Sequence, residues 1–64
     1  MDKIKDRKVL IVDDSKLMRL LLKNIVDGMK FFSKIYEAEN GREALDLLEL
    51  HKVDLILLDI EMPV

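Results

Sequence analysis

The sequence contains no cysteine, so neither a disulfide nor a thiolate metal site can stabilise this chain. A basic surplus is also absent, because 11 Lys and Arg residues stand against 13 Asp and Glu residues. That balance argues against nucleic-acid or membrane-surface binding. No apolar run is long enough to cross a bilayer, and residues 1–8 lack the pattern of a secretory signal. We therefore expect a cytoplasmic protein with no nucleic-acid partner and no membrane partner.

The length of the chain limits how much core it can build alone. Its 64 residues allow one domain at most. A chain of this size buries only about 60% of the surface that its unfolded form exposes, so its monomer is marginally stable. Hydrophobic residues make up 50% of the sequence, which suggests apolar surface that one copy cannot hide. We expect a partner chain, or the remainder of a larger domain, to complete the core.

Three apolar segments are typical of β-strands. Residues 9–12 form a run without polar alternation, as in a strand that is buried on both faces. Residues 34–39 have mixed polarity, which suits the edge of a sheet. Residues 54–59 are the most apolar of the three, and composition alone therefore predicts a central strand there.

Helical spacing fills both intervals between these strands. Ser15 is the expected N-cap of the first helix, which should end within residues 28–30. Its expected core residues are Met18, Leu21, Leu22, Ile25 and Met29, and its expected solvent-facing residues are Lys16, Arg19, Lys23 and Asp27. Asn40, followed by Glu43, predicts a capping-box start for the second helix, which should end near Lys52. This alternation of strands and helices predicts parallel strands joined by right-handed crossovers, an α/β fold.

Three motifs in this order carry a family resemblance: VLIVDDS at residues 9–15, EAENG at 37–41 and DLILLDIEMP at 54–63. Together they resemble the first half of the receiver domain of two-component response regulators. The resemblance implies half of a flavodoxin-like doubly wound parallel sheet, in which the strand order is second–first–third. Residues 1–64 are therefore expected to be a truncated receiver half-domain.

The resemblance also implies a site. Asp13 and Asp14 would bind Mg²⁺, the backbone carbonyl of Glu61 would be the third protein ligand, and Asp59 would accept a phosphoryl group from a sensor histidine kinase. Physical chemistry agrees with this assignment. Neighbouring strands lie about 4.8 Å apart, so acids at the ends of the first and third strands converge and repel one another. Mg²⁺ prefers such hard oxygen ligands.

The later half of the family domain has no counterpart in this sequence, including its hydroxyl residue, its lysine and its aromatic residue. We therefore expect impaired phosphoryl transfer and a protein that is not an enzyme. The third strand would also have no neighbour on its outer edge, which favours association. We expect a homodimer in which the two third strands pair antiparallel about a twofold axis and complete the sheet. The alternative is an exchange of strands or helices that imitates the absent half.

Two alternatives remain open for the function. Taken alone, Asp13-Asp14-Ser15 is usually a turn and helix cap, and Asp59 a strand terminator. The chain could therefore be a structural, self-assembling half-domain with a vestigial acidic site. A haloacid-dehalogenase-like phosphohydrolase also uses a strand-end Asp. It ranks last, because Glu61 stands where that class requires a second Asp and because it leaves Asp13 and Asp14 unexplained.

Overall fold

The computed structural model describes residues 7–59 of the chain. Its elements are β1 (Lys8–Asp13), α1 (Lys16–Met29), β2 (Lys34–Ala38), α2 (Gly41–Leu50) and β3 (Leu55–Asp59). The expected segments are confirmed with boundaries that differ by one or two residues. Neither helix has the length and apolarity needed to cross a bilayer within the described range.

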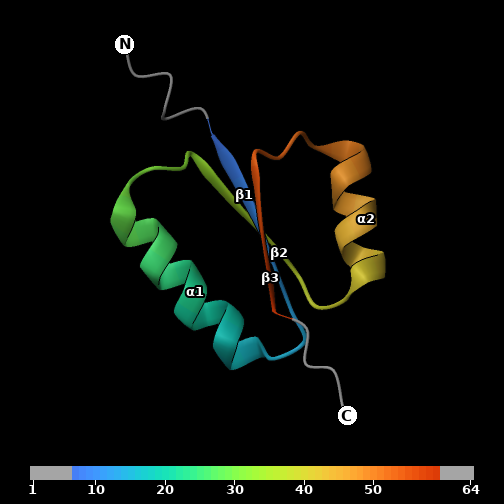
Figure 1. Cartoon of the computed structure of the whole chain (residues 1–64), viewed down its shortest axis with the longest axis horizontal. Coiled ribbons are helices and arrows are strands. Elements are labelled where there is room, and N and C mark those ends of the chain that lie inside the picture. The colour runs from blue at the N-terminus through green and yellow to red at the C-terminus, as the bar shows by residue number, and fades with distance from the viewer. Residues whose placement is uncertain (1–6, 60–64) are drawn as a thin grey trace.

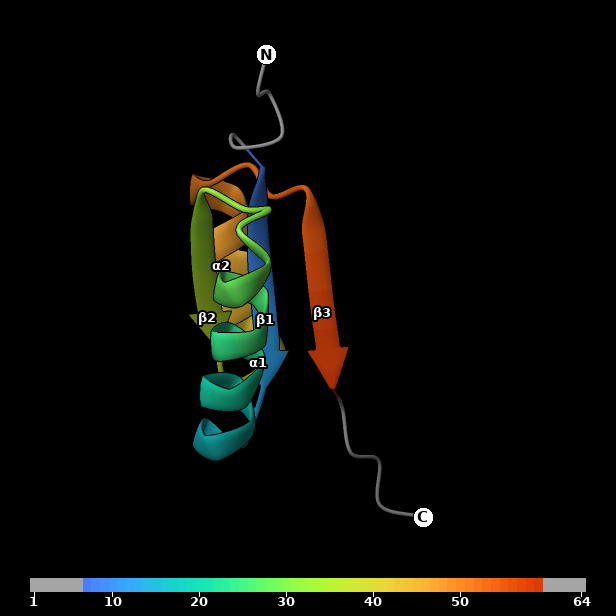
Figure 2. The ribbon, with the colours of Figure 1, turned by 90° about the vertical axis from the view of Figure 1, so that its left-hand side faces the viewer.

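The three strands form one parallel sheet in the order β2–β1–β3, as predicted. The sheet lies between the two helices, with α1 over one face and α2 over the other (Figure 1). A view from the side shows both helices over β1 and β2, whereas β3 stands beside them (Figure 2). β1 is therefore the middle strand of the described sheet, and β3 occupies an edge instead of the centre that its composition alone predicts.

The core is centred on β1. Val9, Leu10 and Ile11 are 0% exposed, and Val12 is also buried. Leu10 and Val12 belong to a core cluster on the α2 side of the sheet, together with Ala38 and Ala44, with Tyr36, Leu47, Leu48 and Val53 around it. The alternate residues of β1 face α1, because successive side chains of a strand point to opposite faces. The unbroken apolar run of β1 thus reflects burial on both faces.

Helix α1 packs on the sheet through a different flank from the one we predicted. Val26 is its buried residue, and Leu22 is half-buried. Four of the five expected core residues are exposed by 38–61%: Met18, Leu21, Ile25 and Met29. The prediction is wrong because apolar residues occupy two neighbouring flanks of this helix. Helical periodicity shows that such residues share a flank, but it does not show which flank meets the sheet.

The helix ends agree closely with the sequence. The Ser15 hydroxyl accepts a hydrogen bond from the backbone N–H of Met18 at 3.3 Å, and the Asn40 side chain accepts one from Glu43 at 2.8 Å. The Glu43 carboxylate accepts from the backbone N–H of Glu39 at 2.9 Å, one residue before the expected capping-box donor. Both predicted N-caps are confirmed, and each satisfies a backbone donor that the first turn leaves free.

Candidate functional site

The carboxyl ends of β1 and β3 bring two of the predicted site residues into register. Asp13 and Asp59 are direct backbone partners in the parallel pairing of these strands. Asp14 follows Asp13 in the turn that leads into α1, and its side chain is exposed. Glu61 lies outside the described residues. The sheet therefore places Asp13, Asp14 and the backbone of Asp59 together at the carboxyl end of its strands, as the sequence predicted.

Asp13 is buried, with 3% of its surface exposed. Its Oδ1 atom accepts a hydrogen bond from the backbone N–H of Ser15 at 2.9 Å. Its Oδ2 atom is buried and has no hydrogen-bond partner. A buried carboxylate oxygen without a partner is costly, and a bound cation would remove that cost.

The acids present fit a hard divalent cation. Carboxylate and carbonyl oxygens with retained water are the ligands that Mg²⁺ prefers. Within residues 7–59, no three acidic, histidine or cysteine side chains gather as a preformed metal cluster. The remaining protein ligand that we predicted, the carbonyl of Glu61, lies beyond that range. Asp13 and Asp14 are thus the predicted magnesium ligands that lie within the described residues.

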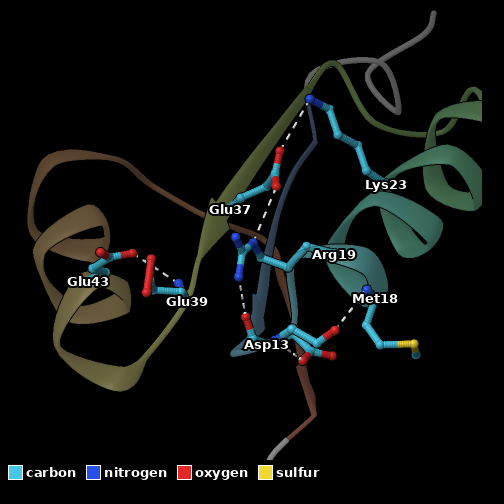
Figure 3. A network of polar contacts seen from close by, with 8 residues as sticks. Asp13, Met18, Arg19, Lys23, Glu37, Glu39 and Glu43 are labelled. Carbon is cyan, nitrogen blue, oxygen red and sulfur yellow. Dashed lines mark hydrogen bonds and ion pairs between the residues drawn. The ribbon is translucent and has the colours of Figure 1, made fainter.

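A polar network joins this edge to α1 and β2 (Figure 3). The Arg19 guanidinium donates through Nη1 to the backbone carbonyl of Asp13 at 2.6 Å. Its Nε atom lies 3.5 Å from Glu37 Oε1, and Lys23 Nζ lies 3.2 Å from Glu37 Oε2. A single guanidinium therefore contacts the end of β1 and a side chain of β2.

The prediction that Arg19 faces water is wrong, because its side chain is only 14% exposed. Sequence reasoning missed it by treating every charged residue of α1 as solvent-facing. A usable signal was present: Arg19, Leu22 and Val26 follow the three- and four-residue spacing of one helix flank. That flank is the one that meets the sheet, and the acid that pairs with Arg19 comes from β2.

The parallel strand order and the strand-end acids define a class of α/β signalling domain. Residues 9–64 match the family described as the response regulator receiver domain. The chain therefore belongs to the response regulator receiver domain family, as its motifs predicted.

Several relatives are similar over most of this chain. The protein-glutamate methylesterase/protein-glutamine glutaminase of Treponema pallidum is 52% identical over 58 residues, which are 91% of this chain and 14% of that protein. Its counterpart in Bacillus subtilis is 47% identical over 57 residues, 89% of this chain and 16% of that protein. The chemotaxis protein CheY of Listeria monocytogenes is 48% identical over 56 residues, 88% of this chain and 46% of that protein.

A solved structure shows the same fold. The crystal structure of the P1 domain of CheA3 in complex with CheY6 from R. sphaeroides contains a chain that matches with a TM-score of 0.80. The match is 48% identical and covers 94% of this chain and 47% of that chain. The predicted flavodoxin-like arrangement of strands and helices is confirmed by this likeness.

The relatives correct one prediction, that the protein is not an enzyme. Several similar proteins carry the name protein-glutamate methylesterase/protein-glutamine glutaminase, which describes enzymes. The expectation is therefore wrong as it stood, because this family of domains occurs in enzymes. The chain spans 14–17% of the length of those first relatives, and what it shares with them is receiver sequence.

Proposed function

We propose that this chain is a cytoplasmic phosphorelay receiver module in which Asp59 accepts a phosphoryl group from a sensor histidine kinase. The observation that carries the proposal is the register of β1 and β3, which pairs Asp13 with Asp59 at the carboxyl ends of neighbouring strands. Membership of the receiver family supports the role, and a chemotaxis protein is among the relatives. The solved structure that contains the matching chain is of the P1 domain of CheA3 in complex with CheY6, and it supports a kinase as partner.

In the proposed reaction, a carboxylate oxygen of Asp59 forms a bond to phosphorus while the phosphorus–nitrogen bond of a phosphohistidine breaks. The leaving imidazole nitrogen keeps the electron pair and takes up a proton from water. The product is an acyl phosphate on Asp59. Asp13, Asp14 and the backbone carbonyl of Glu61 would hold Mg²⁺. The bound ion would supply neutralising charge between the acceptor and the phosphoryl group.

Acetyl phosphate offers a direct test, because it can donate a phosphoryl group without the kinase. We expect mass spectrometry to show one added phosphoryl group on the wild-type chain when Mg²⁺ is present. Asp59→Asn should show none, while the control Asp46→Asn, which alters an exposed acid of α2, should behave as wild type. A wild-type chain that gains no phosphoryl group would contradict the proposal, as would one modified at another carboxylate.

A second candidate function, self-assembly through β3, has its own observation. Leu55, Ile56 and Leu58 of this strand are 42–56% exposed, although all three are apolar. Within the described residues, β3 pairs with β1 on one side and has no strand on the other. An open apolar edge of this kind favours pairing with another strand.

We propose that the partner is a second copy of this chain, related by a twofold axis. Two β3 edges related in this way run antiparallel, so the sheet would continue as β2–β1–β3–β3–β1–β2. The two acidic ends would then lie at opposite ends of the joined sheet. The dimer would therefore cover β3 without bringing one acidic site against the other.

Sedimentation velocity over a range of concentrations tests this dimer. We expect Leu58→Lys to leave a monomer, because it places a charge on the joined strand. The control Leu50→Lys changes a residue that is 77% exposed at the end of α2, and it should leave the dimer intact. A wild-type chain that stays monomeric at all concentrations would remove this second candidate and leave the phosphorelay proposal untouched.

A further inference from the structure

The turn that carries Asp13 and Asp14 is tied to β2, the strand beside β1, by the largely shielded guanidinium of Arg19. We propose that Arg19 is a positioning residue that, held by Glu37, fixes the conformation of this turn. The expected effect on Mg²⁺ binding rests on the proposed function, whereas the effect on the turn itself does not.

The contacts of Arg19 join its own helix, α1, to two strands. From α1, its Nη1 donates to the Asp13 carbonyl at the end of β1, and its Nε lies 3.5 Å from Glu37 Oε1 on β2. The first contact, at 2.6 Å, is a short charge-assisted hydrogen bond. Arginine suits this place because its planar fork presents several donors in a fixed geometry, which a lysine cannot do. The side chain is largely shielded from water, which strengthens both contacts.

Asp13 is consequently held from two sides. Arg19 binds its backbone carbonyl, and the Ser15 backbone N–H binds its Oδ1. The first bond fixes the backbone of Asp13 and the second orients its carboxylate, while Oδ2 keeps its full capacity to accept a ligand. Hydrogen bonds behind a ligating carboxylate orient it, and their loss typically weakens metal binding. Arg19 would thus orient Asp13 for binding a cation, although Arg19 itself would not contact that cation.

Lys23 provides a matched control within the same network. It pairs with Glu37 at 3.2 Å and lies one helical turn beyond Arg19. Its side chain is 47% exposed, and no hydrogen bond or ion pair of the described structure links it to Asp13. A change at Lys23 removes a charge beside Glu37 and leaves the tie to the turn in place.

Amide hydrogen exchange in metal-free buffer tests the positioning directly. The Ser15 amide reports on the turn, and the Leu10 amide, in the buried middle strand β1, reports on global stability. Relative to Leu10, we expect Arg19→Gln to speed exchange at Ser15 about tenfold, the low end for a lost charged hydrogen bond. Lys23→Gln should change it by less than about twofold.

Two further variants separate positioning from folding. Arg19→Lys keeps the charge but cannot hold Asp13 and Glu37 together, so it should restore only part of the Ser15 protection. Glu37→Gln leaves Arg19 in place and removes its anchor, so it should raise Ser15 exchange less than Arg19→Gln does. If Arg19→Gln fails to fold, these two variants decide the question. Ser15 exchange equal to wild type in both would overturn the proposal.

Titration of the same samples with Mg²⁺ connects the turn to the cation. We expect the dissociation constant for Mg²⁺ to rise about tenfold in Arg19→Gln and to stay unchanged in Lys23→Gln. If wild type does not respond to Mg²⁺, the cation part of the proposed function fails, and faster Ser15 exchange in Arg19→Gln still supports positioning. Unchanged Ser15 exchange in a folded Arg19→Gln overturns the positioning proposal, whatever wild type does with Mg²⁺.

Discussion

Strands β1 and β3 are alike in sequence and unlike in surroundings. Both are apolar, both run parallel, and each ends in an aspartate at paired positions. Yet Leu10 of β1 is 0% exposed, whereas its register partner Ile56 of β3 is 42% exposed. β1 has a strand on each side and a helix over each face, and β3 stands outside both helices (Figure 2). An apolar strand is therefore buried by its neighbours, and its composition alone does not determine its burial.

The two strands also differ in the functional roles that we propose for them. β1 is the buried strand that carries Asp13, whose backbone carbonyl also accepts the hydrogen bond from Arg19. β3 supplies the paired aspartate at the end of a strand whose apolar side chains remain open to a partner. In our account, the packed strand holds the cation ligand and the open strand presents the phospho-acceptor.

The largest expected effect compares the register partners Leu10 and Ile56. Leu10→Ala should lower the free energy of unfolding by about 3 kcal/mol, because it leaves a cavity in the packed core. Ile56→Ala should cost less than about 1 kcal/mol, because much of the Ile56 side chain remains in water. Urea unfolding at low protein concentration measures both. Equal losses of unfolding free energy at the two positions would contradict the difference in packing between β1 and β3.

A smaller effect is expected where the two strands end. In metal-free buffer, Asp59→Asn should raise the free energy of unfolding by on the order of 1 kcal/mol, because our account gathers its charge with those of Asp13 and Asp14 and the substitution removes it. The same variant should gain less stability from added Mg²⁺, since it binds the ion more weakly. Thermal unfolding with and without Mg²⁺ measures both effects, with Asp46→Asn as the control. An unchanged melting temperature without metal would count against clustered acids.

A change at the N-cap of α2 tests the comparison between β1 and β3 through the helix on the other face of the sheet. Asn40→Ala should lower the free energy of unfolding by about 1 kcal/mol, because the Glu43 backbone N–H loses its acceptor. Since α2 packs on β2 and β1, amide exchange should accelerate in those strands more than in β3. Glu49→Ala, at an exposed position of the same helix, should leave exchange unchanged. Greater acceleration in β3 than in β1 would show that α2 supports the open strand as well.

The smallest effect is expected at Lys23. Lys23→Gln should change the free energy of unfolding by no more than about 0.5 kcal/mol, because its pair with Glu37 is exposed to solvent. Urea unfolding beside wild type is sufficient to measure it. A loss comparable to that of Leu10→Ala would mean that the polar network, and not the β1 core, dominates the stability of this layer.

The sequence predicted those features that depend on local signals. The apolar run of β1 and the caps Ser15 and Asn40 were predicted correctly, because they depend on the local sequence pattern and on local hydrogen bonds. The strand order was also correct, because three motifs in the right order indicated the family fold. Asp13 and Asp59 were placed together because parallel strands end at one edge of the sheet.

The errors concern contacts between segments far apart in the sequence. Which flank of α1 meets the sheet depends on packing against β1 and β2, so Met18 and Ile25 were wrongly assigned to the core. Arg19 is shielded because Glu37, from another element, pairs with it. Spacing within α1 places Arg19 on one flank with Leu22 and Val26, but it shows neither that this flank meets the sheet nor that Glu37 pairs with Arg19.

The central claim is that the acids at the ends of β1 and β3 form a cation site. A ¹⁵N–¹H correlation spectrum of the wild-type chain, recorded during titration with Mg²⁺, tests it most directly. We predict dispersed peaks and shifts confined to Asp13, Asp14, Asp59 and their immediate neighbours. Dispersed peaks that do not respond to Mg²⁺ would contradict the account and leave the chain as an assembly unit with a vestigial acidic edge.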